Sequence, residues 1–305
     1  MHILTVDNAG NKTETVKGPI TVEKVMAKVG EIVTGENKEY EKNGTAIIPV
    51  GFAIKPGCDD IENGLVISDV ANDVNDTGNQ FVWIPVEDAS SYQKNANYPL
   101  TYGKTTNITV YNSTELASRL PSDISDESIP VLKAKGFYIG RFETGNGLVS
   151  KKGVNVWASL TQATAIDQSK KFINNSYVKS GIVTGTQWDV CMNFVDGKDD
   201  GAGGKFYVKT GSTSRHTQAN NPTLSGKNEH DRVCNIYDLE GNVAEISPER
   251  YDWGVTGGTR QGWNVCFRGG ACYINNAYHY FSANRYPNND SSSATNGFRM
   301  VLYVM

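Results

Sequence analysis

The sequence lacks the features that define several large classes of protein. No run reaches the ~18 consecutive apolar residues of a membrane-spanning helix, so we expect no membrane span. No basic and then apolar leader opens it, so we expect no secretion signal in these residues. The net charge is −4, which gives no strong field to attract nucleic acid or an anionic membrane.

Cysteine is scarce, and its spacing excludes two further classes. The five cysteines include no CxxC pair, so zinc-ribbon and thioredoxin-like motifs are excluded. One disulfide is compatible with the count, but unpaired buried thiols are the default expectation. The cysteines are Cys58, Cys191, Cys234, Cys266 and Cys272.

The composition that remains is that of an ordinary globular protein. The chain has 305 residues, 20% charged and 38% hydrophobic, enough for one large domain and a small appendage. We expect the domain over residues 46–305, preceded by an N-terminal remnant and linker over residues 1–45. Leu4–Asn11 resembles the last strand of bacterial immunoglobulin-like repeats, and Thr21–Lys42 is expected to be a helical or coil connector. The sequence is therefore expected to be a piece of a longer protein.

Hydrophobic periodicity predicts an α+β fold. From residue 47 on, short apolar runs alternate with Gly, Asn and Asp clusters, which is typical of strands and turns. Thr161–Asn174 has helical period, with Thr161 as N-cap and one shared face formed by Ala163, Ile166, Lys170 and Ile173. Thr186–Val195 also has helical period and stacks Trp188, Cys191, Met192 and Val195. Residues 196–228 predict a long surface loop, and two helices among short strands favour α+β.

Four motifs carry a family resemblance. They are Gly136–Thr144 (GFYIGRFET), Gly185–Asp189 (GTQWD), Tyr237–Glu245 (YDLEGNVAE) and a terminal set of Arg268-Gly269-Gly270, Arg285 and Gly297-Phe298-Arg299. In this order and spacing they resemble the formylglycine-generating-enzyme (sulfatase-modifying-factor) family, over about Phe81–Met305.

The resemblance implies a C-type-lectin-like fold with a small twisted antiparallel sheet, two helices and long irregular loops. Independently of the family, Gly269-Gly270 predicts a turn that residues without a side chain accept easily. Trp188 and Phe298 are expected to be buried. The three terminal arginines are expected to be paired, because an unpaired buried guanidinium would be costly.

The residues that carry oxidase chemistry in that family are not reproduced here. Its enzymes bind Cu(I) through two cysteines five residues apart, shortly after the Gly-Gly pair, because soft thiolates retain that ion. Those positions fall on Ile274 and near His279 here, and Cys266 and Cys272 have a different spacing. The four histidines form no H-x-x-x-H-x-E run of the kind that related sulfoxide synthases need. We therefore expect no enzyme and no required cofactor.

The turn at Asn242–Glu245 leaves two alternatives open. In the family this turn can hold Ca²⁺ through hard oxygen donors, which Asn242 and Glu245 could supply. Ala244 and Ile246, however, replace the family's flanking tryptophans. The alternative is a Gly-Asn turn capped by its own side chain.

The C-terminal segment (residues 264–297) has the composition of antigen-combining loops, with tyrosines interleaved among Asn and Ser. The alternative is a polar loop with structural tyrosines. We expect a largely exposed binding face made of Tyr273, Asn275, Asn276, Tyr278, His279, Tyr280, Ser282, Asn284, Tyr286, Asn288, Asn289 and Asp290.

A second feature of the C-terminal segment concerns the residues missing from it. Proteins of this fold are targets of diversity-generating retroelements, whose reverse transcriptase misreads template adenines. Changing the adenines of an Asn codon never gives Lys, Glu, Gln, Met or Trp, and all five are absent from residues 264–297. The resemblance thus implies a non-catalytic variable protein, displayed extracellularly, on a cell surface or on a virion. Its ligand would be an unknown protein or glycan on another cell or surface. The alternatives are a formylglycine-generating-type oxidoreductase and an inert module of a phage tail or surface fibre.

Overall fold

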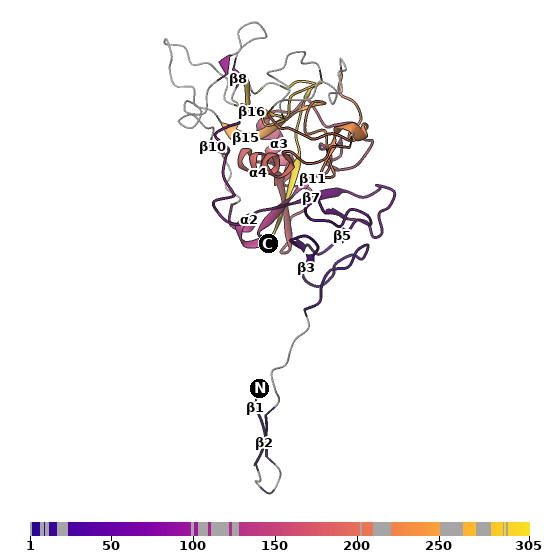
Figure 1. Ribbon diagram of the computed structural model, residues 1–305, viewed down its shortest axis with the longest axis vertical. Helices are drawn as coiled ribbons and strands as arrows, with labels where there is room; N and C mark the ends of the chain where they lie inside the picture. Colours follow the sequence, from indigo (N-terminus) through magenta and orange to yellow (C-terminus); the bar gives the residue numbers. More distant parts are fainter. Residues whose placement is uncertain are drawn as a thin grey trace.

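The computed structural model describes residues 24–98, 128–201, 203–209, 221–250, 265–272, 282–288, 290 and 292–305, the strands at 2–6, 12–16, 101–102, 109–110 and 122–123, and Ala9. The largest sheet in this part has the order β12-β19-β11-β7-β6-β5, and all neighbouring strands are antiparallel (Figure 1). Its strands are β5 (Ala53–Ile54), β6 (Val66–Ser68), β7 (Gln80–Pro85), β11 (Gly136–Gly140), β12 (Val178–Ile182) and β19 (Met300–Val304).

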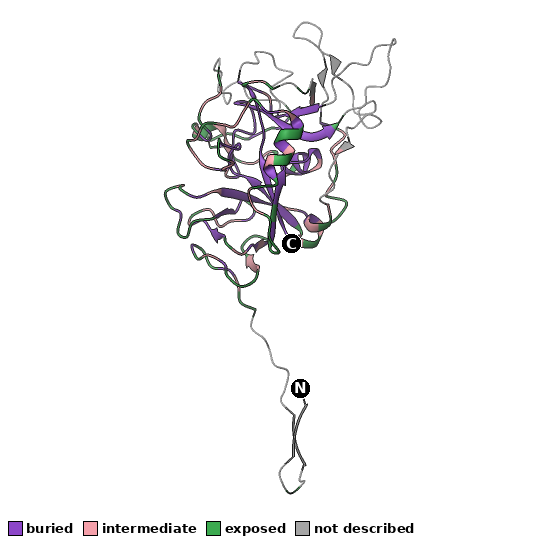
Figure 2. Ribbon diagram, turned by 180° about the vertical axis from the view of Figure 1, so that it is seen from behind, coloured by how far each residue is buried: buried purple, intermediate pink, exposed green. Residues whose placement is uncertain are grey.

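The six-stranded sheet is buried on both faces. Side chains alternate across a strand, so Phe81 and Trp83 of β7 join one apolar cluster, and Val82 and Ile84 join the other. The five residues of β19 alternate between the same two clusters and are all buried (Figure 2). Burial on both faces explains why these strands are short continuous apolar runs in the sequence.

A second sheet gathers the C-terminal motifs. Its order is β10-β15-β16-β17, and β18 pairs with β15 in parallel. The strands are β10 (Ser122–Asp123), β15 (Ala244–Arg250), β16 (Val265–Arg268), β17 (Tyr286–Asn288) and β18 (Asn296–Gly297). Four antiparallel pairs complete the described strands: β1 (His2–Val6) with β2 (Lys12–Val16), β3 (Lys38–Glu41) with β4 (Thr45–Ile48), β8 (Thr101–Tyr102) with β9 (Thr109–Val110), and β13 (Arg232–Val233) with β14 (Ile236–Tyr237). The molecule is thus a mixed α and β structure with small antiparallel sheets, as expected.

Helix α4 (Gly185–Val195) confirms its predicted face. Trp188, Cys191, Met192 and Val195 are all buried. The helix begins one residue before the predicted start, because Thr184 and Gln187 form a capping box that satisfies N–H groups of the first turn.

Helix α3 (Gln162–Ser169) has the predicted N-cap, part of the predicted face and an earlier end. Thr161 accepts a hydrogen bond from the Thr164 N–H, as expected. The fully buried residues are Gln162, Ala165 and Ser169. Of the predicted face, Ile166 and Ile173 pack against the core and are partly buried, but Ala163 and Lys170 are exposed, so the prediction is only partly right. Gln162 is buried because its side-chain amide donates hydrogen bonds to the backbone oxygens of two β15 residues, at 2.7 and 3.1 Å. Helix α2 (Ser128–Ala134) and the 3-10 turn η1 (Glu229–Asp231) were not predicted.

The packing differs from two expectations, one about where the packed region begins and one about the predicted surface loop. Ala27 and Val33 belong to the core and β3 pairs with β4, so the packed region extends to the N-terminal side of residue 46. Within residues 196–228, Phe206 and Val208 are 4% and 0% exposed, so this stretch is not surface loop throughout. No helix among the described residues is long and apolar enough to cross a membrane.

The two-faced burial of the sheet predicts a large cost for truncating β19. Leu302 is 0% exposed, and we expect Leu302→Ala to lower the free energy of unfolding by about 2–5 kcal/mol through lost burial and a cavity. Met305, 39% exposed, supplies the control: Met305→Ala should change it by less than about 0.5 kcal/mol. Urea denaturation measures both, and equal losses would contradict this account of the core.

Candidate functional site

The C-terminal segment leaves the second sheet at a glycine turn. β16 ends at Arg268, and Gly269 and Gly270 follow with φ of 77° and 78°. A Cβ on Gly269 would lie 2.3 Å from a Glu245 carboxylate oxygen. Both the left-handed backbone and the lack of space therefore favour glycine, which confirms the predicted turn.

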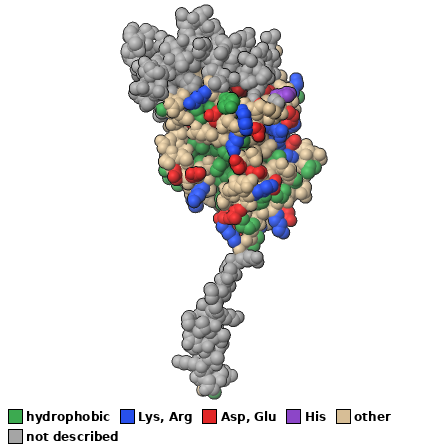
Figure 3. Space-filling model, in the orientation of Figure 1, with side chains coloured by type: hydrophobic (Ala, Val, Ile, Leu, Met, Phe, Trp, Pro, Cys, Tyr) green, Lys and Arg blue, Asp and Glu red, His purple; other side chains and the backbone are tan. Residues whose placement is uncertain are grey.

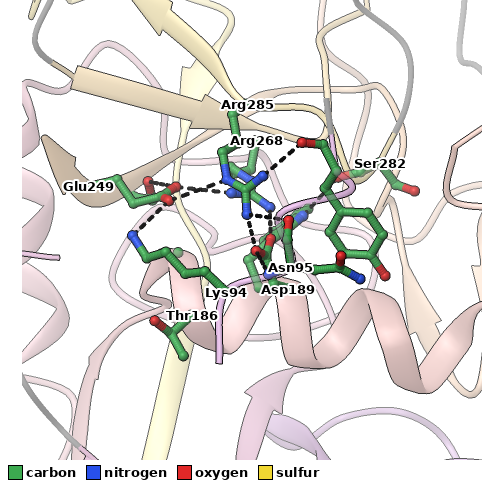
Figure 4. A network of polar contacts seen from close by, with 12 residues as sticks. Lys94, Asn95, Thr186, Asp189, Glu249, Arg268, Ser282 and Arg285 are labelled. Carbon is green, nitrogen blue, oxygen red and sulfur yellow. Dashed lines mark hydrogen bonds and ion pairs between the residues drawn. The ribbon is translucent and has the colours of Figure 1, made fainter. Parts of the chain in front are cut away.

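Two arginines of the segment meet one aspartate in the protein interior. Asp189 of α4 accepts hydrogen bonds from the guanidinium groups of Arg268 and Arg285, one on each carboxylate oxygen. Figure 4 shows the two guanidiniums between Glu249 and Asp189, above α4. Arg268 also donates to Glu249 of β15 at 3.0 Å, and Arg285 lies 3.7 Å from it. All four side chains are fully buried.

Arg285 links the C-terminal segment to a loop far away in the sequence. Its guanidinium donates to the backbone oxygens of Tyr98, at 2.9 Å, and Asn95, at 3.3 Å. The Asn95 N–H in turn donates to Asp189 at 2.8 Å. The middle of the segment and residues 95–98 are thus held at the same carboxylate, which confirms that Arg285 is paired.

These groups form a central network whose charges balance. Lys94 lies 3.0 Å from Glu249 and 3.4 Å from Asp123. Three acids therefore meet three bases: Asp123, Asp189 and Glu249 against Lys94, Arg268 and Arg285. Burial would raise the pKa of Glu249, but the positive charges of Arg268, Lys94 and Arg285 outweigh it and hold that pKa well below its usual value.

Asp123 of β10 joins the central network to the start of α4. Its carboxylate accepts hydrogen bonds from the Gly185 N–H at 2.8 Å and from the Thr186 hydroxyl at 2.8 Å. A negative charge at a helix N-terminus is favoured by the exposed N–H groups there. Burial, and then the charge of Glu249, nevertheless raise the pKa of Asp123.

The far end of the segment is held by a second buried arginine site. Phe298 and Arg299 are 0% exposed. Arg299 donates to Glu245 at 2.9 Å and to the backbone oxygens of Gly140, Tyr237 and Asp238 at 2.9–3.1 Å. The expectation that Trp188 and Phe298 are buried, and that the three arginines are paired, is confirmed.

The Arg299 site has an excess of acid, unlike the central network. Glu143, Asp238 and Glu245 surround the one guanidinium. Burial raises the pKa of Glu245 to about 8 and that of Asp238 to about 6, and burial, with the charges of Asp238 and Glu245, raises the pKa of Glu143 well above its usual value.

The described candidate ligand-binding residues are less exposed than expected. Ser282 and Asn284 are 0% and 2% exposed, so the expectation of exposure was wrong for both. The cause is that residues 282–285 pack against α4, where Arg285 donates to Asp189 and the Ser282 carbonyl accepts the Trp188 indole N–H at 2.7 Å. Tyr286 is half-buried against the core, while Asp290 is exposed and accepts the Gln162 N–H at 2.7 Å.

The other candidates fall largely beyond what the structure describes. Asn288 is described only as part of β17, opposite Val265. The remaining candidates lie outside the described residues: Tyr273, Asn275, Asn276, Tyr278, His279, Tyr280 and Asn289. Their exposure stays a prediction.

The turn at Asn242 uses its side chain for protein contacts. The Asn242 amide oxygen accepts the Thr223 N–H at 2.8 Å, and its amide nitrogen donates to Glu143. Glu245 pairs with Arg299. Among the described residues, no group of three or more His, Cys, Asp and Glu side chains is arranged to hold a metal. A Ca²⁺ ion at Asn242 and Glu245 would have to compete with these contacts, and its binding stays a prediction.

The five cysteines are free thiols, four of them buried and Cys58 half-buried. Burial raises the pKa of Cys266 and of Cys272. Thiolates, the form that binds copper, are therefore disfavoured at the two positions nearest the Gly-Gly turn.

Comparisons with known proteins give little beyond this geometry. No protein-family model matches the chain, and no curated protein matches it. Among solved structures, the chain is similar to Treponema denticola variable protein 1, with a TM-score of 0.38 and 14% identity. The likeness covers 66% of this chain and 97% of that chain. A likeness at this level leaves the functional argument to the residues themselves.

The shared role of Asp189 predicts a large loss on neutralisation. Asp189→Asn removes the charge that Arg268 and Arg285 share, and we expect the free energy of unfolding to fall by about 3–5 kcal/mol. Asp167→Asn, on the exposed side of α3, is the matched control and should cost less than about 0.5 kcal/mol. A loss below about 1 kcal/mol for Asp189→Asn in chemical denaturation would contradict the network's structural role.

The raised pKa of Glu245 predicts a pH dependence with a definite sign. A carboxyl whose pKa rises on folding, here from 4.5 to about 8, stabilises fully below the lower value and loses its contribution as the pH rises. We expect the free energy of unfolding to fall from about pH 5 to 8, by up to ~1.4 kcal/mol per pH unit. Glu245→Gln should reduce this slope, with Glu143 and Asp238 supplying what remains, and Glu36→Gln, at an exposed glutamate, should preserve it. An unchanged slope in Glu245→Gln would refute the assignment.

Proposed function

We propose that this chain is a non-catalytic ligand-binding protein with a C-type-lectin-like fold, in which the C-terminal segment forms a diversifiable binding face. Its ligand is a protein or glycan on another cell or surface. The chain is displayed extracellularly, on a cell surface or on a virion, and needs no cofactor for this role. A Ca²⁺ ion at Asn242 and Glu245 would be a structural addition.

One observation supports the proposal above others: the segment is anchored by its own arginines to acids that lie outside it. Arg268 and Arg285 pair with Asp189 and Glu249, and the segment is followed at once by Arg299, which pairs with Glu245. The anchors therefore do not depend on the other side chains of the segment. A scaffold built in this way can tolerate exchange at the positions between its anchors.

The chemistry of those positions favours recognition. Tyrosine provides large contact area at low entropic cost, and asparagine and serine adapt their hydrogen bonds to different ligands. Ser282 and Asn284 are buried, so we assign them to the scaffold. The proposed contact positions are Tyr273, Asn275, Asn276, Tyr278, His279, Tyr280, Tyr286, Asn288, Asn289 and Asp290.

A displayed library tests the proposal directly. The contact positions are randomised in one library, and Arg268, Asp189 and Arg285 in a second, and protease-resistant variants are sequenced from both. We expect most of the first library to resist and almost none of the second. Selection of the first library on an unrelated protein should yield specific binders. If the contact positions are as intolerant as the anchors, or no binders emerge, the segment is structural.

The proposal also predicts how a pair of tyrosines differs from an anchor. Tyr278→Ala with Tyr280→Ala should shift the melting temperature by only about a degree or two, as expected for surface sites worth less than ~0.5 kcal/mol each. Arg285→Ala should lower it far more, because it leaves Asp189 with one partner fewer in the interior. Against any identified ligand, the double variant should lose about 2 kcal/mol or more of binding. Unfolding of the double variant would place the tyrosines in the core.

Two further measurements address the alternatives. A reverse-transcriptase gene beside a near-duplicate of the segment's coding sequence would support diversification. An assay of oxygen uptake with Cu(I) and a cysteine-containing peptide should show no turnover, whereas uptake would favour the oxidase.

A further inference from the structure

One lysine of the central network is buried beside two acids. The Lys94 ammonium nitrogen lies 3.0 Å from a carboxylate oxygen of Glu249 and 3.4 Å from Oδ2 of Asp123. The side chains of Lys94, Asp123 and Glu249 are 13%, 12% and 0% exposed. Figure 3 shows Lys and Arg side chains on the described surface, where water solvates them, whereas Figure 4 shows Lys94 directed at Glu249. A lysine removed from water becomes a nucleophile once it gives up a proton.

The carboxyl group of Asp123 is held by hydrogen-bond donors at the start of α4. Its Oδ1 accepts the Gly185 N–H at 2.8 Å, and its Oδ2 accepts the Thr186 hydroxyl at 2.8 Å. An attack on Cγ of Asp123 would place negative charge on Oδ1, and a backbone N–H at a helix N-terminus stabilises such a charge. The Thr186 hydroxyl would support Oδ2 as it departs. Each oxygen of this carboxyl group therefore has the donor that an acyl transfer requires.

The two acids beside Lys94 differ in what they can do. Glu249 is also bound by Arg268, so it stays an anion, and it lies within hydrogen-bond reach of the proton that it would accept from Lys94. Burial, and then the charge of Glu249, raise the pKa of Asp123, which increases the share of its protonated form. The protonated form is the one from which water can leave. Glu249 is therefore suited to be the base, and Asp123 to be the group that is attacked.

Gly185 gives an independent observation on this arrangement. A Cβ at this position would overlap the carboxyl carbon of Glu249. A residue without a side chain is therefore needed here, because the Glu249 carboxylate packs against the first turn of α4. The same glycine donates its N–H to Asp123. The absence of a side chain thus brings the base, the lysine and the Asp123 carboxyl group together at one helix end.

We propose that Lys94 and Asp123 form an intramolecular isopeptide bond. Nζ of Lys94 gives one proton to Glu249 and attacks Cγ of Asp123, so that an Nζ–Cγ bond forms. The Cγ–Oδ2 bond then breaks, and Oδ2 leaves as water with a second proton from Nζ. The third proton stays on the amide nitrogen, and Oδ1 becomes the amide oxygen. The reaction consumes no oxidant or reductant, because it only expels water.

The charge balance of the central network favours this product. The bond removes one acid and one base together, and Glu249 passes its proton to the solvent. Asp189 and Glu249 then still face Arg268 and Arg285. A buried ion pair is replaced by a neutral amide, which is less costly to keep from water. The bond also closes residues 95–122 into a covalent loop, which lowers the entropy of the unfolded chain. It does not depend on the proposed binding face.

A second buried lysine shows what distinguishes Lys94. Lys55 lies 3.0 Å from Asp76, and its side chain is 7% exposed. Arg141, however, also lies 3.0 Å from the same carboxylate oxygen, so Asp76 has two cations beside it. Two cations hold a carboxylate as the anion, from which water does not leave. We therefore expect no bond at Lys55.

Intact mass spectrometry of the full chain, denatured after purification, tests the proposal. The wild type should be lighter than its sequence mass by one water molecule. Lys94→Arg, Asp123→Ala and Glu249→Gln should each have the full sequence mass, because they remove the nucleophile, the attacked group or the base. Lys152→Arg, at a surface ion pair, is the matched control and should still lose one water. Lys94→Arg keeps the positive charge, so a cooperative melting transition shows that this variant is folded.

Peptide mapping locates the bond. Trypsin should leave Lys94 uncleaved and give a branched peptide in which Leu120–Lys133 is attached to it, and fragmentation should place the attachment at Asp123. A folded wild type with its full sequence mass would overturn the proposal. So would a branched peptide joined at Glu249 or at Lys55, or a loss of water that persists in Lys94→Arg, since each would assign the missing water to other residues.

Discussion

The position of the C-terminal segment depends on the burial of Arg268 and Arg285 beside Asp189. A guanidinium removed from water must keep its partners, and the partners come from three directions: α4, β15 and the backbone at residues 95–98. None of these elements can move without leaving a buried charge unmatched, which would cost several kcal/mol. The network therefore fixes the position of the C-terminal segment, which is polar and has few apolar side chains to pack.

The two buried charge sites differ in one respect that determines their behaviour with pH. The central network has three acids and three bases, so its carboxylates Asp189 and Glu249 are matched, and positive neighbours lower the pKa of Glu249. The Arg299 site has three acids and one base, and burial there, which the single guanidinium does not offset, raises the pKa of Glu245 and Asp238. We therefore expect a larger part of the pH dependence of stability to come from the Arg299 site.

Sequence reasoning succeeded where apolar periodicity or backbone geometry carries the information. The face of α4 was predicted because its buried residues are mostly apolar, and the Gly269-Gly270 turn because few residues accept its φ values. It failed where polar groups are buried through hydrogen bonds. Gln162 defines the buried face of α3 by reaching β15, and Ser282 lies in the interior because its carbonyl serves Trp188. Lys94 and Glu249, 155 residues apart, carry no local signal that they meet.

The same distinction bears on the proposed variation of the segment between its anchors. Arg268 and Arg285 gain their stabilisation from acids elsewhere in the chain, so a neighbour's side chain adds little to it. Replacing either arginine, in contrast, leaves Asp189 or Glu249 short of a counter-charge at a fully buried position. Selection for ligand binding would therefore act on positions between the anchors, and selection for folding on the anchors.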